Sequence, residues 1–253
     1  MEQKLINRLL AYLGIILCWV VFFSFFSTNR QNKCIVSNAA GYEMKLQSLY
    51  EEEQILLESN ERNILGSNKI VVVDAGHGGM DSGTCSKDEK YLEKNINLKI
   101  VGYMKELLDE CGIKVYYTRL TDKKMEPEER VEFINNVKAD LVVSIHCNYG
   151  KNKDANGVEV LYSSNEERKQ ELTSKEFSDI LKKEILSITH QNDRGLLAGD
   201  NIYIISRSKV PIALVEVGFM SNREELKFLL DEGNQQKIAM GLFNGIIRTL
   251  EER

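Results

Sequence analysis

The stretch that decides the fold is KIVVVDAGHGGMDSGT, which runs from Lys69 to Thr84. Residues 70–73 are all β-branched, as in a buried strand, and a glycine-rich turn with His77 at its centre follows directly. In many α/β proteins a strand that leads into such a turn binds phosphate. The question is therefore whether this turn binds a phosphate group or serves to present His77.

The glycines of the turn fit neither of the two common phosphate-binding patterns. No Gly-Lys-Ser/Thr follows, as a P-loop requires, and the spacing is not G-x-G-x-x-G. The residues that come next, MDSGTC, do not open a helix either. The glycines instead suit a tight backbone path that leaves His77 uncovered.

Outward from this stretch, apolar runs alternate with amphipathic segments to the end of the chain. This alternation predicts a single α/β domain over residues 69–253, with a mostly parallel central sheet flanked by helices on both faces. We expect strands at 70–73, 114–118, 141–145, 158–162, 202–205 and 212–217. We expect helices at 93–110, 127–134, 166–188, 223–231 and 235–251, with Asn222 as the N-cap of the fourth.

Two further regions precede this domain. Residues 9–29 carry no charge, and about 20 such residues suffice to span a bilayer. Lys4 and Arg8 lie before them, so the positive-inside rule places this end in the cytoplasm and the rest of the chain outside. We expect residues 1–29 to form a hydrophobic helix that acts as a membrane anchor, in preference to a cleaved signal segment, and residues 30–68 to form a polar stalk or linker.

Charge and cysteine content exclude several classes of protein. The chain of 253 residues has a formal net charge of −5, which does not favour nucleic acid as a partner. Its five cysteines are irregularly spaced and form no CxxC pair, so neither a zinc ribbon nor a redox motif is indicated. No pattern indicates the oligomeric state.

Three residues with catalytic potential follow or end predicted strands. His77 follows the first strand, His146 follows LVVSI, and Glu216 lies within PIALVEVGF. The carboxyl ends of parallel strands meet at one edge of a sheet, where sites gather. An imidazole or carboxylate between Val and Ile side chains is also costly to bury without a partner. We therefore expect these residues to share one site.

Two histidines and a carboxylate form a suitable ligand set for a catalytic zinc ion, which leaves one position for water. Glu93, at the start of the next predicted helix, is a second carboxylate that can lie near His77 in space, although an acidic residue there is also explained by the helix dipole. No H-E-x-x-H motif is present. The residues alone leave open which carboxylate would bind the metal and which would move protons.

Six blocks then carry a resemblance to a known family: VVVDAGHGGMDSGT, LEKNINL, YTRLTD, ERVEFINNVKADLVVSIHCN, RGL and ALVEVGFMSNREE. In this order they resemble the zinc-dependent N-acetylmuramoyl-L-alanine amidase family, the type-3 amidase domain, from Lys69 to about Leu250. The resemblance implies that His77, Glu93 and His146 bind one Zn²⁺ and that Glu216 is the catalytic acid/base. It also implies cleavage of the amide between N-acetylmuramic acid and L-alanine of peptidoglycan stem peptides.

Four more residues have two readings each. Asp74 and Asn148 flank the expected ligands and are candidates to orient them, although strand-end turns also favour these residue types. Arg194, in RGL, contacts substrate or pairs with an acidic surface residue, and we favour the pair. Cys147 stands where family members carry a small residue, and we expect its side chain to pack away from the metal.

The arrangement of a lone catalytic domain behind a hydrophobic segment most resembles the cortex-type, germination-specific amidases of spore formers. That subtype implies muramic-δ-lactam formation in spore cortex, with the enzyme exported and either membrane-anchored or secreted. Because three protein ligands could hold zinc weakly, an accessory protein that aids zinc binding is a further expectation. The alternatives are a weakly active peptidoglycan-binding or scaffold protein, and a zinc peptidase that cuts within the stem peptide.

Overall fold

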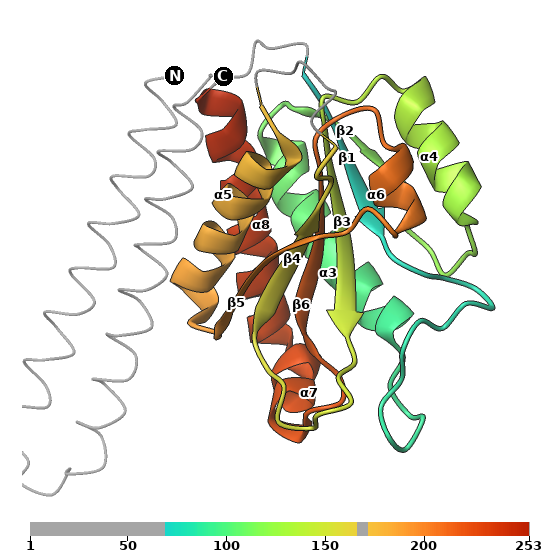
Figure 1. Ribbon diagram of the computed structural model, residues 1–253, viewed down its shortest axis with the longest axis vertical. Helices are drawn as coiled ribbons and strands as arrows, with labels where there is room; N and C mark the ends of the chain where they lie inside the picture. Colours follow the sequence, from blue (N-terminus) through green and yellow to red (C-terminus); the bar gives the residue numbers. More distant parts are fainter. Residues whose placement is uncertain (1–68, 166–171, 253) are drawn as a thin grey trace, which may run out of the picture. The chain divides into compact units, whose positions relative to one another are not determined.

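The computed structural model describes residues 69–165 and 172–252. Within them, six strands form one sheet with helices on both faces (Figure 1), which confirms the predicted α/β domain. The hydrophobic helix expected at 1–29 and the stalk expected at 30–68 lie outside the described residues. Within the described ranges, no helix combines the length and the apolar character that a membrane crossing needs.

The sheet brings the carboxyl ends of four strands, β1, β2, β3 and β6, to one edge. β1, β3 and β6 lie side by side in parallel, β2 pairs in parallel with β1, and β4 runs antiparallel to β6 and parallel to β5. The order across the sheet is β2-β1-β3-β6-β4-β5. The amino end of β4 therefore meets the carboxyl ends of β1, β3 and β6. The strands are β1 (Ile70–Ala75), β2 (Lys114–Tyr117), β3 (Leu141–Asn148), β4 (Val158–Tyr162), β5 (Asp193–Ala198) and β6 (Ile212–Phe219).

Several of the described helices begin at a capping residue or at a proline. The Thr173 side chain accepts a hydrogen bond from the Glu176 amide at the start of α5, and Asn222 accepts from two amides at the start of α7, as expected for an N-cap. Pro127 opens α4. The helices are α3 (Glu93–Glu110), α4 (Pro127–Asn136), α5 (Ser174–Thr189), α6 (Tyr203–Arg207), α7 (Arg223–Leu230) and α8 (Glu232–Glu251).

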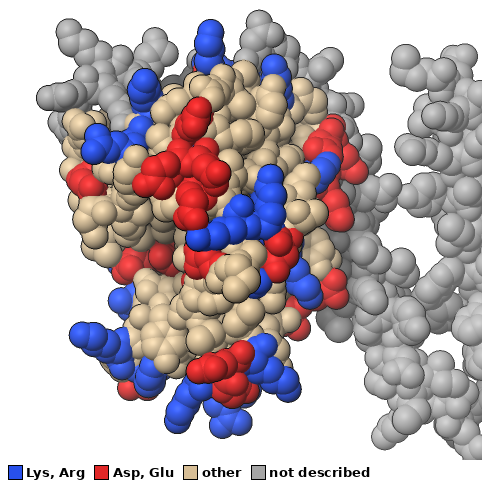
Figure 2. All heavy atoms as spheres, turned by 90° about the vertical axis from the view of Figure 1, so that its right-hand side faces the viewer, with Lys and Arg blue, Asp and Glu red and all other residues tan. Residues whose placement is uncertain are grey.

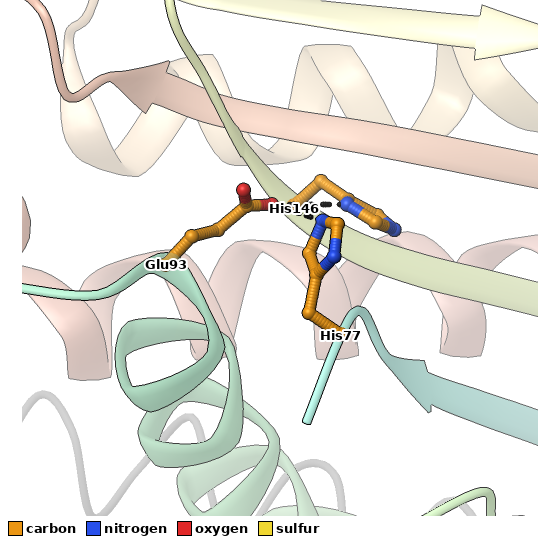
Figure 3. A group of neighbouring side chains, drawn as sticks. All are labelled: His77, Glu93 and His146. Carbon is orange, nitrogen blue, oxygen red and sulfur yellow. Dashed lines mark hydrogen bonds and ion pairs between the residues drawn. The ribbon is translucent and has the colours of Figure 1, made fainter. Parts of the chain in front are cut away.

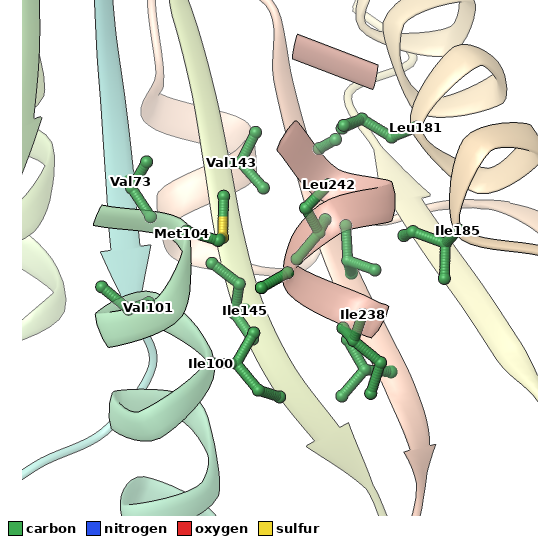
Figure 4. Packing of buried hydrophobic residues seen from close by; sticks show 14 of the residues in the cluster. Val73, Ile100, Val101, Met104, Val143, Ile145, Leu181, Ile185, Ile238 and Leu242 are labelled. Atoms are coloured by element: carbon green, nitrogen blue, oxygen red, sulfur yellow. The ribbon is translucent and has the colours of Figure 1, made fainter. Parts of the chain in front are cut away.

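The central strands are buried on both faces. Val73 of β1 belongs to the larger cluster with α3, α5 and α8 (Figure 4), whereas Val72 packs in a smaller cluster with α4 and α6. Met104 of α3 and Leu242 of α8 are fully buried in the larger cluster, and burial of such side chains stabilises the fold by about 1.5–3 kcal/mol each. Burial on both faces explains the unbroken apolar runs of β1, β3 and β6.

Two sequence predictions are wrong. The segment expected as a strand at 202–205 is part of helix α6 and its approach, and the strand lies earlier, at β5. Ile204 and Ile205 are buried because α6 packs on the sheet, not because they extend it. The helix expected from 166 begins only at Ser174, and residues 166–171 are not among those described.

The side of the domain that carries α4 and α6 has a mixed surface. Figure 2 shows acidic and basic clusters lying next to one another on this side. Among the described residues that this view shows, neither sign of charge forms a broad continuous field. Such a surface does not resemble the extended basic face of a nucleic-acid-binding protein.

Candidate active site

The turn after β1 is built to bring its side chains close to their neighbours. A Cβ atom on Gly76 would lie 2.3 Å from Cε1 of His146, and one on Gly83 would lie 2.5 Å from Oε2 of Glu93. Glycine is therefore required at both positions by close approach. His77 itself has a left-handed backbone, with φ of 62°. The turn thus presents a histidine.

His77, Glu93 and His146 converge from three elements (Figure 3). Glu93 is the first residue of α3, and His146 lies near the end of β3. Oε1 of Glu93 lies 3.2 Å from Nε2 of His77 and 3.0 Å from Nδ1 of His146. One potential ligand atom from each of the three residues lies within 4.8 Å of the others.

Glu93 is held from several directions. Its side chain is almost fully buried, and its Oε2 accepts a hydrogen bond from the Thr84 amide (2.7 Å). Its Oε1 accepts from the Cys147 amide (3.0 Å) and from Nδ2 of Asn97 (3.3 Å). Burial alone would raise the pKa of Glu93, but its hydrogen bonds and charge interactions with the two histidines hold this pKa well below its usual range. The carboxylate is therefore ionised at neutral pH.

His77 is oriented by a carboxylate that the sequence analysis missed. Its Nδ1 lies 2.8 Å from Oδ2 of Asp81, which leaves Nε2 to face Glu93. Burial opposes the charged imidazolium, but the hydrogen bonds and charges of Glu93 and Asp81 raise the pKa of His77 to about 9. The available signal was an acidic residue four positions after a candidate ligand in the same turn, because a ligand histidine commonly donates its other N–H to a carboxylate.

These three residues fit a zinc ion. A catalytic zinc takes three protein ligands from His and carboxylate side chains, and this set offers two imidazoles and one ionised carboxylate. The raised pKa of His77 reports a site of negative potential, where a bound cation would take the place of a proton. Asp81 also fixes which nitrogen of His77 faces the other two residues.

Glu216 stands beside this group in a different environment. In β6 it pairs across the sheet with His146 of β3 on one side and with Glu159 of β4 on the other. Its Oε2 atom is buried and has no hydrogen-bond partner among the described residues. Burial raises the pKa of Glu216 to about 7, with His146 opposing the rise and Glu93 adding to it. Such a carboxyl group can take up and release a proton near neutral pH.

Asp74 bonds to groups other than the two histidines. It accepts hydrogen bonds from Oγ1 of Thr118 (2.7 Å) and Oγ of Ser144 (2.6 Å), and it forms an ion pair with Arg130. Burial raises its pKa, but these partners, Arg130 first, hold it below the usual value. Asp74 therefore ties the end of β1 to β2, β3 and α4.

The other two candidates meet at Glu159. Nδ2 of Asn148 donates to Oε2 of Glu159 (3.2 Å), and Nε of Arg194 lies 3.6 Å from Oε1 of the same carboxylate. The Arg194 guanidinium also stacks 4.6 Å from the centre of the Phe219 ring. These contacts place both residues around the carboxylate that neighbours Glu216.

Cys147 packs into the core, as expected for a side chain that alternates with His146 along β3. Only 3% of the residue is exposed, and its Sγ contacts Oδ1 of Asn97 at 3.5 Å. Its backbone amide, and not its thiol, bonds to Glu93.

The chain is similar to known proteins over most of the described domain. A family model described as N-acetylmuramoyl-L-alanine amidase matches residues 71–248. The germination-specific N-acetylmuramoyl-L-alanine amidase of Bacillus subtilis (strain 168) is 31% identical over 201 residues, which cover 74% of this chain and 82% of that protein.

Two solved structures share the fold. The catalytic domain of CwlV, an N-acetylmuramoyl-L-alanine amidase from Bacillus (Paenibacillus) polymyxa var. colistinus, is 35% identical with a TM-score of 0.67, covering 73% of this chain and 99% of that one. The CwlD amidase from Clostridioides difficile, solved in complex with the GerS lipoprotein, is 32% identical with a TM-score of 0.68, covering 73% of this chain and 100% of that one.

Proposed function

The chain belongs to the N-acetylmuramoyl-L-alanine amidase family. We therefore propose that it hydrolyses the amide bond between N-acetylmuramic acid and L-alanine of peptidoglycan, with a Zn²⁺ ion held by His77, Glu93 and His146. The observation that carries this proposal is the convergence of these three side chains, whose potential ligand atoms lie within 4.8 Å of one another. Zinc at this site would polarise the substrate carbonyl and make water more acidic.

Glu216 is the residue that moves protons in this proposal. Its Oε2 is buried and lacks a hydrogen-bond partner among the described residues, and this environment favours the uptake of a proton from water by the carboxyl group. The water oxygen bonds to the carbonyl carbon, and Glu216 then returns that proton to the alanine nitrogen as the C–N bond breaks, which makes the nitrogen a good leaving group. A carboxyl group with a pKa of about 7 serves both as base and as acid.

In this proposal Asp74, Asn148 and Arg194 hold other parts of the site in place. Asp74 fixes the end of β1 from which the turn to His77 departs. Asn148 and Arg194 hold Glu159 at the edge that Glu216 occupies. The Arg194 side chain is 37% exposed, so its guanidinium is also accessible to an acidic group of the stem peptide.

The place of action is proposed from the relatives and from the N-terminal sequence. Similarity to a germination-specific amidase supports action on peptidoglycan outside the cytoplasm, in spore cortex, on the path to muramic-δ-lactam. The apolar residues 9–29 support a membrane anchor. The complex of CwlD with a lipoprotein supports an accessory protein for this chain, and our proposal gives that protein the role of aiding zinc binding.

The test is the product of the reaction. The full chain, purified in mild detergent, is incubated with muropeptides that carry intact stem peptides, and the products are analysed by mass spectrometry. We expect stem peptides with a free L-alanine amino terminus, loss of activity with a chelator, and its return with zinc. Shortened stems would show a peptidase, and binding without any product would show a scaffold protein.

A further inference from the structure

Two buried arginines that the proposed function does not use contact the turn that carries His77. Arg119 follows β2 in the block YTRLTD, and Arg130 lies in α4 in the block ERVEFINN. Only 1% and 6% of these residues are exposed. Burial of a guanidinium is unfavourable unless its donors are satisfied, so its partners indicate what it does.

Arg119 directs its hydrogen bonds to backbone carbonyl oxygens. Its Nε donates to Ala75 (2.9 Å), and its Nη2 donates to Gly76 (2.9 Å) and to Lys94 (2.8 Å). Its Nη1 makes a longer bond to Thr121 (3.3 Å). Within the described residues, no carboxylate is hydrogen-bonded to it. Arg119 therefore joins the turn after β1 to the first turn of α3, the helix that carries the proposed carboxylate ligand.

Arg130 completes the same run of carbonyls. Its Nη1 donates to Ala75 (3.0 Å), and its Nη2 donates to His77 (2.8 Å). Its ion pair with Asp74 fixes the guanidinium at the end of β1. Three successive carbonyl oxygens, of residues 75, 76 and 77, thus accept hydrogen bonds from two planar guanidinium groups.

The hydrogen bonds of Arg119 and Arg130, which together we call the clamp, surround a residue with a strained backbone. A left-handed backbone at a residue other than glycine, as at His77, costs of order 1–3 kcal/mol and persists only where its surroundings impose it. The hydrogen bonds from the two arginines to the carbonyl oxygens of residues 75–77 supply such surroundings. Lys94 extends the effect, because its Nζ donates to the Gly79 carbonyl (2.8 Å) and pairs with Asp122 (2.7 Å).

We propose that Arg119 and Arg130 are positioning residues that clamp the backbone of residues 75–77, so that His77 meets Glu93 and His146 before any metal binds. The inference deepens the proposed function, on which its metal readout rests. A ligand set that is already ordered loses less conformational freedom when the ion arrives, so it binds the ion more tightly.

The experiment uses Arg119→Lys and Arg130→Lys in the full chain, purified in mild detergent. Lysine keeps the charge but lacks the planar fork of donors, so each variant loses part of the clamp. The matched control is Lys182→Met, which removes a buried cation that pairs with Asp193 (2.8 Å) of β5, the edge strand farthest from β2. Amide hydrogen exchange of the metal-free protein is compared at residues 76–83 and 212–219, and zinc affinity is measured by competition with a chelator.

We expect exchange at 76–83 to become at least about tenfold faster without a comparable change at 212–219, since a tenfold change corresponds to about 1.4 kcal/mol. Zinc affinity should fall about 10–100-fold, as for other residues that orient metal ligands. The control should change neither. Exchange that is unchanged, or equally faster in both segments, together with wild-type zinc affinity, would overturn the proposal.

Two further results keep the inference separate from its premise. If the arginine variants do not fold, Lys94→Met replaces them, with an expected loss of a few-fold at the same segment, and no change there overturns the clamp. If the wild-type chain binds no zinc, the proposed metal function fails, and the exchange data alone still decide whether the arginines order the turn.

Discussion

The two carboxylates at the centre of the site, Glu93 and Glu216, are held in opposite ways. Glu93 has hydrogen bonds on both oxygens, from the amides of Thr84 and Cys147. Glu216, one strand beyond His146, has an oxygen with no partner in the described part of the chain. The pKa of Glu93 accordingly lies well below its usual range, whereas burial raises that of Glu216 to about 7.

This difference shows that surroundings, not residue type, assign the roles. A carboxylate with satisfied oxygens and two imidazoles beside it stays charged and suits a cation. A carboxyl group with an unpaired oxygen and a pKa near neutrality suits proton transfer. Substitutions that alter the surroundings or the charge of one of these two carboxylates at a time test this difference.

The largest effect is expected for Glu216→Gln. Glutamine keeps the size of the side chain but cannot carry a proton between water and the leaving nitrogen, so turnover should fall about 10²–10⁴-fold. The measurement is the rate of stem-peptide release from muropeptides. Glu224→Gln, at an acid of α7 whose side chain is 77% exposed, is the matched control and should retain wild-type activity. A Glu216→Gln enzyme within tenfold of wild type would contradict the assignment.

Asp81→Ala should weaken zinc binding at the group that contains Glu93. Without its carboxylate, Nδ1 of His77 loses the partner at 2.8 Å that fixes the ring, so zinc affinity should fall about 10–100-fold. Competition with a chelating dye measures this affinity. Asp88→Ala, at an acid later in the same loop that bonds to Ser86, is the control and should bind zinc normally. Equal affinities in the two variants would remove Asp81 from the site.

The sequence predicts those parts of the fold whose pattern is contained in a short stretch of residues. The unbroken apolar runs of β1, β3 and β6 predicted those strands, because burial on both faces leaves a clear pattern. β5 was missed because DRGLLA is a half-exposed edge strand with no β-branched residue. The strand expected at 202–205 was wrong because four residues are too few to distinguish a strand from a short helix.

For the site, His77, His146, Glu216 and Glu93 were singled out from their places at strand ends and at a helix start, and the resemblance supplied their expected roles; the structure places them at one edge of the sheet. Asp81 and Arg119 were not assigned roles, because their contacts exist only once the turn after β1 has closed on itself and on residues about 40 positions away. No periodicity marks such contacts. Sequence patterns identify the elements and the chemistry, whereas the orienting contacts need tertiary structure.

The pH dependence of kcat/KM should report the ionisation of the Glu216 carboxyl group. Its carboxyl group must be ionised to act as base, and its pKa is raised to about 7 without metal, a value that a bound cation lowers. Activity should therefore fall about tenfold per pH unit on the acid side of a midpoint that lies at or below pH 7 and above the usual glutamate value. A midpoint at or below pH 4.5 would contradict this prediction.

The smallest expected effect is on stability. The folded-state pKa of Glu216 is raised, so the metal-free folded chain binds this proton more tightly than the unfolded chain, and its contribution to stability is present at pH 4 and lost as pH rises toward 7. Glu216→Gln should then be at least about 1 kcal/mol more stable, relative to wild type, at pH 8 than at pH 5. Urea unfolding measures this difference. A difference independent of pH would contradict it.

The central claim is that Glu93 holds a metal and Glu216 does not, and zinc content tests it most directly. Wild-type chain, Glu93→Gln and Glu216→Gln are purified identically, equilibrated with limiting zinc and assayed by elemental analysis. The account predicts about one zinc per chain in the wild type and in Glu216→Gln, and little in Glu93→Gln. Equal zinc in the two variants, or none in the wild type, would contradict it.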